Sequence, residues 1–194
     1  MKPEFRFYDR EVDQEIAFVK VALERDVKTL HKWHQEPHVI PFWNLNIPIE
    51  KYRSHLKGFL ADPHQTLFLG MMDGDPMSYW EAYWVQGDVV ESCYDPHPGD
   101  QGIHLLIGEP DYLGKGFALP LLRAMVHFQF LQQKTEKVMA EPDIRNKKMI
   151  HIFERCGFEK IKPIELPDKT GMLMFCEREP FERRWKDVFA AEGV

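Results

Sequence analysis

Residues 102–125, GIHLLIGEPDYLGKGFALPLLRAM, decide the fold because they join a strand to a long helix through a glycine turn. Gly102–Gly108 is a short, continuous apolar run, which predicts a buried strand. From Gly116 to about Gln133, apolar residues recur on one face and predict a helix. The two glycines of LGKG let main-chain amides approach a ligand, and the helix start adds partial positive charge. With Lys115, the turn is suited to a pyrophosphate; taken alone, it is equally an ordinary turn.

The flanking sequence alternates strands and helices, which predicts an α/β fold with a mixed, mostly antiparallel central sheet flanked by helices. Asn146 suits the first position of a late helix and Gly157 the position after its end. No repeat or linker divides the chain, so residues 1–194 are expected to form a single domain. The further strands are predicted at Ile16–Leu23, Thr66–Met72, Pro76–Val85, Lys137–Glu141, Phe158–Ile161 and Gly171–Glu177, and the further helices at Glu24–His34, from Pro48, at Asn146–Cys156 and over 181–192.

The composition excludes several protein classes. Hydrophobic residues make up 44% and aromatic residues 13%, which is globular, and the net charge of −6 disfavours a nucleic-acid binder. No apolar run approaches the roughly 20 residues that span a membrane, and the first residues lack a signal-peptide core. Three cysteines without a CxxC pair argue against a disulfide framework or a zinc site. We therefore expect a cytoplasmic protein without membrane contact.

The run HKWHQEPH places His31, His34 and His38 close together and raises the question of a metal. Pro37 interrupts the helix, and neither an acidic residue nor a cysteine completes a convincing ligand set. A surface cluster is the preferred interpretation, and no metal is predicted.

The order of strand, LGKG turn, long helix, short strand, Asn146-led helix and Cys156-Gly157-Phe158 resembles the Gcn5-related N-acetyltransferase (GNAT) family, over roughly Ile16–Glu177. The resemblance implies the GNAT fold, with acetyl-CoA or another short acyl-CoA as co-substrate. Two positions depart from the family pattern. Asp111 stands where the turn usually has Gln or Arg, and Phe153 stands where many members have a tyrosine that protonates the leaving thiolate. The implied cofactor-binding residues are Leu106, Ile107, Leu113, Gly114, Lys115, Gly116, Phe117, Ala118 and Asn146.

His104 lies within the apolar strand, where desolvation favours a neutral, basic imidazole. The alternative is a core histidine that donates to a main-chain carbonyl. Asp143 follows the next strand, where its carboxylate is placed to orient the imidazole or to hold an acceptor nitrogen. It is alternatively a turn residue.

Two stretches, DQGIHLL at 100–106 and AEPDIRN at 140–146, are similar to the siderophore-biosynthesis branch of the family, including N6-hydroxylysine acetyltransferases and mycobactin lysine acyltransferases. So are YWEAYW at 79–84, Tyr94-Asp95 and PDK at 167–169. This resemblance implies acyl transfer to an N-hydroxylated lysine or diamine, with His104 as base and Asp143 as its partner. A hydroxylamine nitrogen is largely neutral near pH 7, so a base of near-neutral pKa suits the step. We expect direct transfer without an acyl-enzyme, and an oxyanion donor at the Leu106 or Ile107 amide.

Trp43, Glu81 and Trp84 are the candidate substrate residues, although aromatic residues more often fill cores. Glu81 is placed either to contact a cationic acceptor or to face solvent. An aminoglycoside 6′-N-acetyltransferase is the alternative enzyme, because it shares the LGKG turn and the Asn-led helix; there an acidic residue replaces the histidine. A non-catalytic acyl-CoA-binding module is the other alternative. The expected partners are an acyl-CoA and a small hydroxylated amine, and association with a siderophore synthetase stays open.

Overall fold

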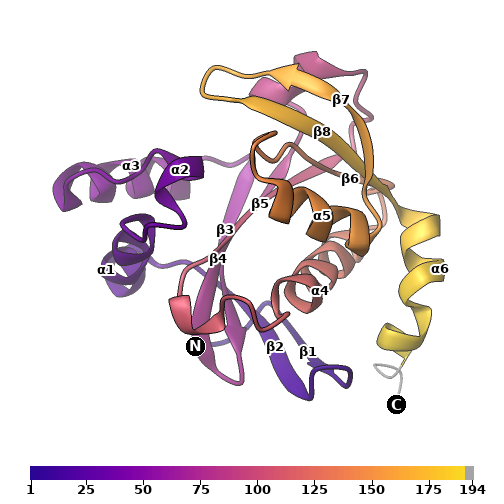
Figure 1. Ribbon diagram of the computed structural model, residues 1–194, viewed down its shortest axis with the longest axis horizontal. Coiled ribbons are helices and arrows are strands. Elements are labelled where there is room, and N and C mark those ends of the chain that lie inside the picture. The colour runs from indigo at the N-terminus through magenta and orange to yellow at the C-terminus, as the bar shows by residue number, and fades with distance from the viewer. Residues whose placement is uncertain (191–194) are drawn as a thin grey trace.

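The computed structural model describes residues 1–190, and two residues of the predicted last helix, 191 and 192, lie outside this range. An eight-stranded sheet in the order β1-β2-β3-β4-β5-β6-β8-β7 forms its centre, with helices on both faces (Figure 1). The strands are β1 Phe5–Asp9, β2 Gln14–Lys20, β3 Gln65–Met72, β4 Asp75–Trp84, β5 Gln101–Ile107, β6 Lys137–Ala140, β7 Glu159–Glu165 and β8 Thr170–Glu177.

The helices divide between the two faces. The two largest clusters of buried apolar side chains lie one against the helices α1 and α3 and one against α4, α5 and α6, and a smaller third cluster includes Tyr83 and Met139. The predicted mixed, mostly antiparallel sheet flanked by helices is confirmed. The helices are α1 Leu23–His34, α2 Ile40–Trp43, α3 Ile49–Ala61, α4 Ala118–Phe130, α5 Lys147–Cys156 and α6 Arg178–Phe189.

The sheet opens between β5 and β6. All other neighbouring strands are antiparallel, but β5 and β6 are parallel and pair only at Gln101 with Val138 and at Gly102 with Met139. Beyond Gly102, β5 keeps β4 as a partner and has no strand from residues 1–190 on its other side. This opening positions the site described below.

Alternation along β5 distributes its side chains between the two cores. Ile103 and Leu105 join the cluster under α4, whereas Leu106 joins the cluster under α1 and α3. Gly108 has no room for a side chain, because a Cβ there would lie 2.0 Å from the Trp33 ring. His104 shares the face of Leu106 and therefore lies on the α1 and α3 side.

The first strand and the long helix α4 differ from the sequence-based expectation. β1 was not predicted, although its alternation places Phe5 and Phe7 in the core. The helix expected from Gly116 begins at Ala118, because Gly116 has a positive φ of 84° that a helix excludes. It ends at Phe130 rather than near Gln133.

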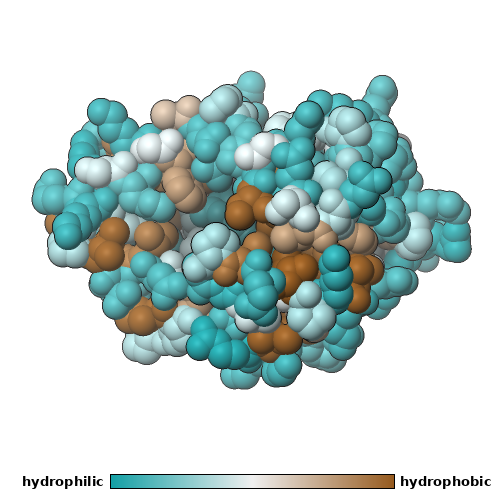
Figure 2. All heavy atoms as spheres, turned by 90° about the horizontal axis from the view of Figure 1, so that it is seen from above, coloured by the Kyte–Doolittle hydropathy of each residue, from teal (hydrophilic) through white to brown (hydrophobic). Residues whose placement is uncertain are grey.

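The surface seen from above in Figure 2 is mostly polar, with apolar side chains gathered toward the middle of that face. Within residues 1–190, no helix has the length and apolar character needed to cross a membrane.

Candidate active site

A cavity of about 240 Å³ lies at the opening between β5 and β6. Its walls come from α2, α3, β4, β5, the segment after β6, α5 and the turn between β7 and β8. Aromatic and charged side chains share the lining, among them Trp43, His55, Glu81, His104, Asp143 and Asp168. No cysteine, serine, threonine or tyrosine of the described chain lines it.

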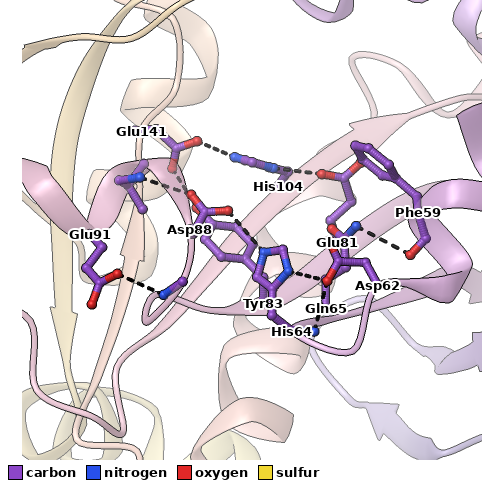
Figure 3. A network of polar contacts seen from close by, with 12 residues as sticks. Phe59, Asp62, His64, Gln65, Glu81, Tyr83, Asp88, Glu91, His104 and Glu141 are labelled. Atoms are coloured by element: carbon purple, nitrogen blue, oxygen red, sulfur yellow. Dashed lines mark hydrogen bonds and ion pairs between the residues drawn. The ribbon is translucent and has the colours of Figure 1, made fainter.

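His104 is held between two carboxylates (Figure 3). Glu81 lies directly opposite on β4, and its Oε2 is 2.7 Å from Nδ1 of His104. Glu141, which follows β6, makes a short contact with Nε2. Two tyrosines hold the carboxylates in place: Tyr79 donates to Glu81 over 3.0 Å and Tyr83 donates to Glu141 over 2.9 Å.

This arrangement makes His104 an imidazolium. A neutral imidazole has one N–H, whereas two ionised carboxylates on its two ring nitrogens require two donors. Burial lowers the pKa of His104, but the charges and hydrogen bonds of Glu141 and Glu81 outweigh it and raise this pKa to about 10. Burial also raises the pKa of Glu141, yet His104 and Lys169 bring it down to about 2. His104 is desolvated as expected, but the expectation that it is neutral is wrong, because the sequence does not reveal that two carboxylates meet its ring.

Asp143 is not the carboxylate that holds His104. Its carboxylate accepts bonds from Arg145 Nε at 2.9 Å and Nη2 at 2.6 Å, and from the Arg145 amide at 2.8 Å. A β-bridge to Gly171 keeps Asp143 beside β8. Glu141, two residues earlier and next to the end of β6, takes the place predicted for it. Asp143 still lines the cavity.

Of the three predicted substrate residues, Trp43 and Glu81 line the cavity and Trp84 does not. The Trp43 ring meets the His104 ring edge to face, with centroids 6.3 Å apart. Glu81 is buried rather than solvated. Trp84 lies on the opposite face of β4, where Lys134 Nζ is 4.1 Å from the centre of its ring. Trp84 therefore lies outside this cavity, contrary to the expected substrate contact.

The glycine turn fits a pyrophosphate. Gly114 and Gly116 have φ values of 73° and 84°, and a Cβ built on either meets no atom of residues 1–190 within 4 Å beyond the glycine's own chain neighbours. Lys115 beside them is exposed, and no side chain caps the start of α4. The amides of the turn and of Ala118 and Leu119 at the start of α4 are thus open to an anion, whereas Pro120 has no N–H to offer. Leu113 is 42% exposed, and Phe117 and Ala118 are half-buried at the same turn.

The free edge of β5 offers main-chain groups to a ligand. The Ile107 carbonyl accepts a bond from His38 Nε2 at 2.8 Å, so the main chain of Ile107 points away from β4. In an antiparallel ladder the neighbouring Leu106 then points its amide toward its β4 partner Tyr79. Of the two predicted amide donors, Ile107 faces the opening and Leu106 does not. This edge fits the amides of a pantetheine chain.

Two further predicted positions lie on α5. Asn146 caps this helix, since its side chain accepts a bond from the Met149 amide, and it also lines the cavity. Phe153 is buried and lines the cavity without a group that could donate a proton. Burial raises the thiol pKa of Cys156, which does not reach the cavity.

The three clustered histidines each bond a main-chain carbonyl: His31 to Ile47, His34 to Leu30 and His38 to Ile107. Across residues 1–190, no group of three or more histidine, cysteine, aspartate or glutamate side chains is arranged to hold a metal ion.

Comparison with known proteins connects this geometry to chemistry. Residues 22–166 match the family model of the acetyltransferase (GNAT) domain. The chain is 34% identical over 165 residues to the N-hydroxyputrescine acetyltransferase of Acinetobacter baumannii. The aligned region covers 85% of this chain and 79% of that protein. Two further curated relatives are longer, and the chain spans about half of the length of each, 56% and 55%.

Solved structures agree with this family. The crystal structure of an uncharacterized protein from Bacillus halodurans superimposes with a TM-score of 0.93 at 49% identity and covers 97% of both chains. The aminoglycoside acetyltransferase AAC(6′)-Ib in complex with coenzyme A gives a TM-score of 0.79 at 26% identity, over 87% of this chain and 98% of that one.

Proposed function

The chain belongs to the GNAT acetyltransferase family and is an acyl-CoA N-acyltransferase, and from this premise we propose that it acetylates the hydroxylamine nitrogen of N6-hydroxylysine or of a hydroxylated diamine. Such products are the hydroxamates of siderophore biosynthesis. The observation that carries the proposal is the contact of both His104 ring nitrogens with the carboxylates of Glu81 and Glu141 at the open edge of β5. The relative named for N-hydroxyputrescine supports the choice of acceptor. Because the chain is an acyltransferase, we do not pursue the alternative of a non-catalytic acyl-CoA-binding module.

The two carboxylates and the imidazolium form one titrating unit with a net charge of −1. As the neutral hydroxylamine nitrogen attacks the thioester carbonyl, the new C–N bond forms and nitrogen must lose a proton. In our proposal the unit accepts this proton on its cavity side, through Glu81 and His104, and becomes neutral. His104 therefore acts as a base together with its carboxylates rather than alone.

The same unit supplies the proton that the product thiol needs. When the C–S bond breaks, the departing sulfur carries a negative charge, and Phe153 has no proton to offer. Return of the nitrogen's proton from the unit to sulfur balances the reaction and restores the net charge of −1. The absence of a cysteine, serine or threonine from the cavity lining of residues 1–190 supports direct transfer without an acyl-enzyme. The Ile107 amide is the proposed oxyanion donor.

Thiol release from acetyl-CoA tests the proposal. The purified protein is assayed with N6-hydroxylysine, N-hydroxyputrescine, N-hydroxycadaverine, plain lysine and kanamycin side by side. Turnover with a hydroxylamine and with neither lysine nor kanamycin is the expected result. Turnover with plain lysine but with no hydroxylamine would refute the proposal.

The second candidate is an aminoglycoside 6′-N-acetyltransferase, and one observation favours it. AAC(6′)-Ib shares 26% identity and most of the fold with this chain, and the acidic side chains of the cavity would suit a polycation. Turnover with kanamycin and with none of the other acceptors would support this candidate over the proposed function.

Replacing His104 tests its role directly. We expect His104→Gln to reduce turnover about a hundredfold or more, as loss of a proton-transfer group does, while coenzyme A still binds in calorimetry. His151→Gln is the matched control, since His151 is exposed on α5 and lies outside the cavity. An active His104→Gln variant would place the proton-accepting group elsewhere.

A further inference from the structure

The charges on the cavity wall are balanced at every position but one. Glu81 is paired with His104. Asp143, on the segment after β6, is held by the guanidinium of Arg145. Lys169, in the turn between β7 and β8, extends to within 3.5 Å of Glu141 and keeps only 16% of its side chain exposed. Lys169 also lines the cavity, but its charge is compensated by the buried carboxylate of Glu141.

Asp168 is the exception. It lines the cavity from the same turn and is exposed, and within residues 1–190 its carboxylate has no hydrogen bond or ion pair. The turn itself is fixed, because the Leu166 amide donates to the Lys169 carbonyl at 2.9 Å. Figure 1 shows the tip of the β7–β8 hairpin reaching toward the side of the molecule that holds α2 and α3, which form the facing wall.

The opposite wall is apolar and aromatic. Phe42 and Trp43 of α2 and Phe59 of α3 line it. His55 of α3 adds no cation near pH 7, because burial lowers its pKa. The cavity thus combines a reacting unit at its β5 end, an apolar wall for methylene groups and one unpaired carboxylate at its β7–β8 rim.

We propose that Asp168 binds an ammonium group at the far end of the acceptor, so that the site selects an N-hydroxylated diamine over an N-hydroxylated amino acid. This inference rests on the proposed function. A hydroxylated diamine is neutral at its hydroxylamine and cationic at its other end, which matches the two ends of the cavity. An N-hydroxylated amino acid also has an ammonium at that end, but the carboxylate on the same carbon brings a negative charge that Asp168 repels, so its net attraction to Asp168 is weaker. Asp168 is a specificity-determining residue, since it touches the acceptor away from the reacting atoms.

Steady-state kinetics of Asp168→Asn test the inference with three acceptors. These are N-hydroxyputrescine, N6-hydroxylysine and N-butylhydroxylamine, which has no charge at its far end. We expect the wild type to prefer N-hydroxyputrescine to N6-hydroxylysine in kcat/KM. In Asp168→Asn, KM for N-hydroxyputrescine should rise about threefold to tenfold with kcat little changed, as expected for one partly exposed ion pair. KM for N-butylhydroxylamine should stay the same.

Salt provides a second readout. In the wild type, KM for N-hydroxyputrescine should rise with ionic strength because salt screens an exposed ion pair, and Asp168→Asn should lose most of this dependence. Asp187→Asn is the matched control: it removes the same charge from an exposed position on α6, outside the cavity.

The outcomes separate the two proposals. Turnover of hydroxylamines with an unchanged KM in Asp168→Asn, or a wild-type preference for N6-hydroxylysine, overturns the inference and leaves the proposed function standing. Failure of every hydroxylamine to support thiol release overturns the proposed function and this inference with it.

Discussion

At the scale of single residues, Glu141 is the group that does most to keep His104 protonated. Its charge and its hydrogen bond are the two largest influences that raise the pKa of His104. We expect Glu141→Gln to lower this pKa by about one to three units, the usual effect of one close opposite charge. Titration of the imidazole resonances by NMR measures it. Asp143→Asn serves as the control, since Asp143 bonds Arg145 instead; an equal shift in that variant would contradict the assignment of partners.

The same pKa has a consequence for stability. A histidine whose pKa rises on folding stabilises the native state fully below its unfolded pKa, and the contribution disappears as pH rises through the folded value. For His104 this window runs from about 6.5, the value of an unperturbed histidine, to about 10. The difference in unfolding free energy between the wild type and His104→Gln should therefore shrink steadily across this range. Urea denaturation at several pH values measures it, and a difference that grows with pH would contradict the imidazolium.

Sequence reasoning reached some site residues and not others for identifiable reasons. His104 stood out as a polar residue in an apolar strand, and period-2 alternation placed Glu81 on one face of β4. The same alternation puts Trp84 on the face opposite Glu81. The sequence pattern was therefore sufficient to show that Trp84 and Glu81 do not line the same cavity. Glu141 was overlooked in favour of Asp143, because the choice depends on where β6 ends and on its register with β8, which are long-range properties.

At the scale of elements, the glycine turn before α4 allows a controlled comparison of two glycines. A Cβ has open space at both Gly116 and Gly58, but Gly116 has a φ of 84° and Gly58 lies within α3. We expect Gly116→Ala to destabilise the fold by about 1–2 kcal/mol, the cost of a left-handed conformation for a residue with a Cβ. Gly58→Ala should instead stabilise it by about 0.5–1 kcal/mol, because alanine is the better helix former.

Calorimetry with coenzyme A separates binding from stability in this pair. Gly116→Ala should bind more weakly because strain in the turn redirects the amides that fit the pyrophosphate. Gly58→Ala should bind like the wild type, since α3 lies away from the turn. Equal affinities in the two variants would argue against a pyrophosphate at this turn.

The opening between β5 and β6 could not be predicted from local sequence patterns. The strands other than β1 were predicted near their observed positions, since apolar runs and turn residues are local signals. That β5 and β6 pair at two positions only depends on the packing of α4 and α5 and on β8. Local patterns therefore predicted most of the strands but not the opening between β5 and β6.

At the scale of the whole molecule, one buried cation joins three segments that are distant in sequence. Arg123 of α4 is 1% exposed, and its Nε lies 3.1 Å from Asp9 of β1, which is fully buried. It also contacts Glu11 after β1, and its guanidinium carbon is 4.8 Å from the centre of the Trp185 ring in α6. The N-terminal hairpin and the C-terminal helix thus share one charged contact.

Removing this cation should weaken the fold far more than removing a cation from the surface. Arg123→Met leaves the Asp9 carboxylate buried without its partner, and loss of one member of a buried ion pair costs about 3–5 kcal/mol. Arg183→Met is the matched control, because Arg183 pairs with Glu179 on the exposed face of α6 and such pairs contribute about 1 kcal/mol or less. Urea denaturation measures both. If Asp9→Asn combined with Arg123→Met recovers much of the loss, the uncompensated carboxylate is its cause; a loss that persists in the double variant would assign it to the packing of the Arg123 stem against Trp185.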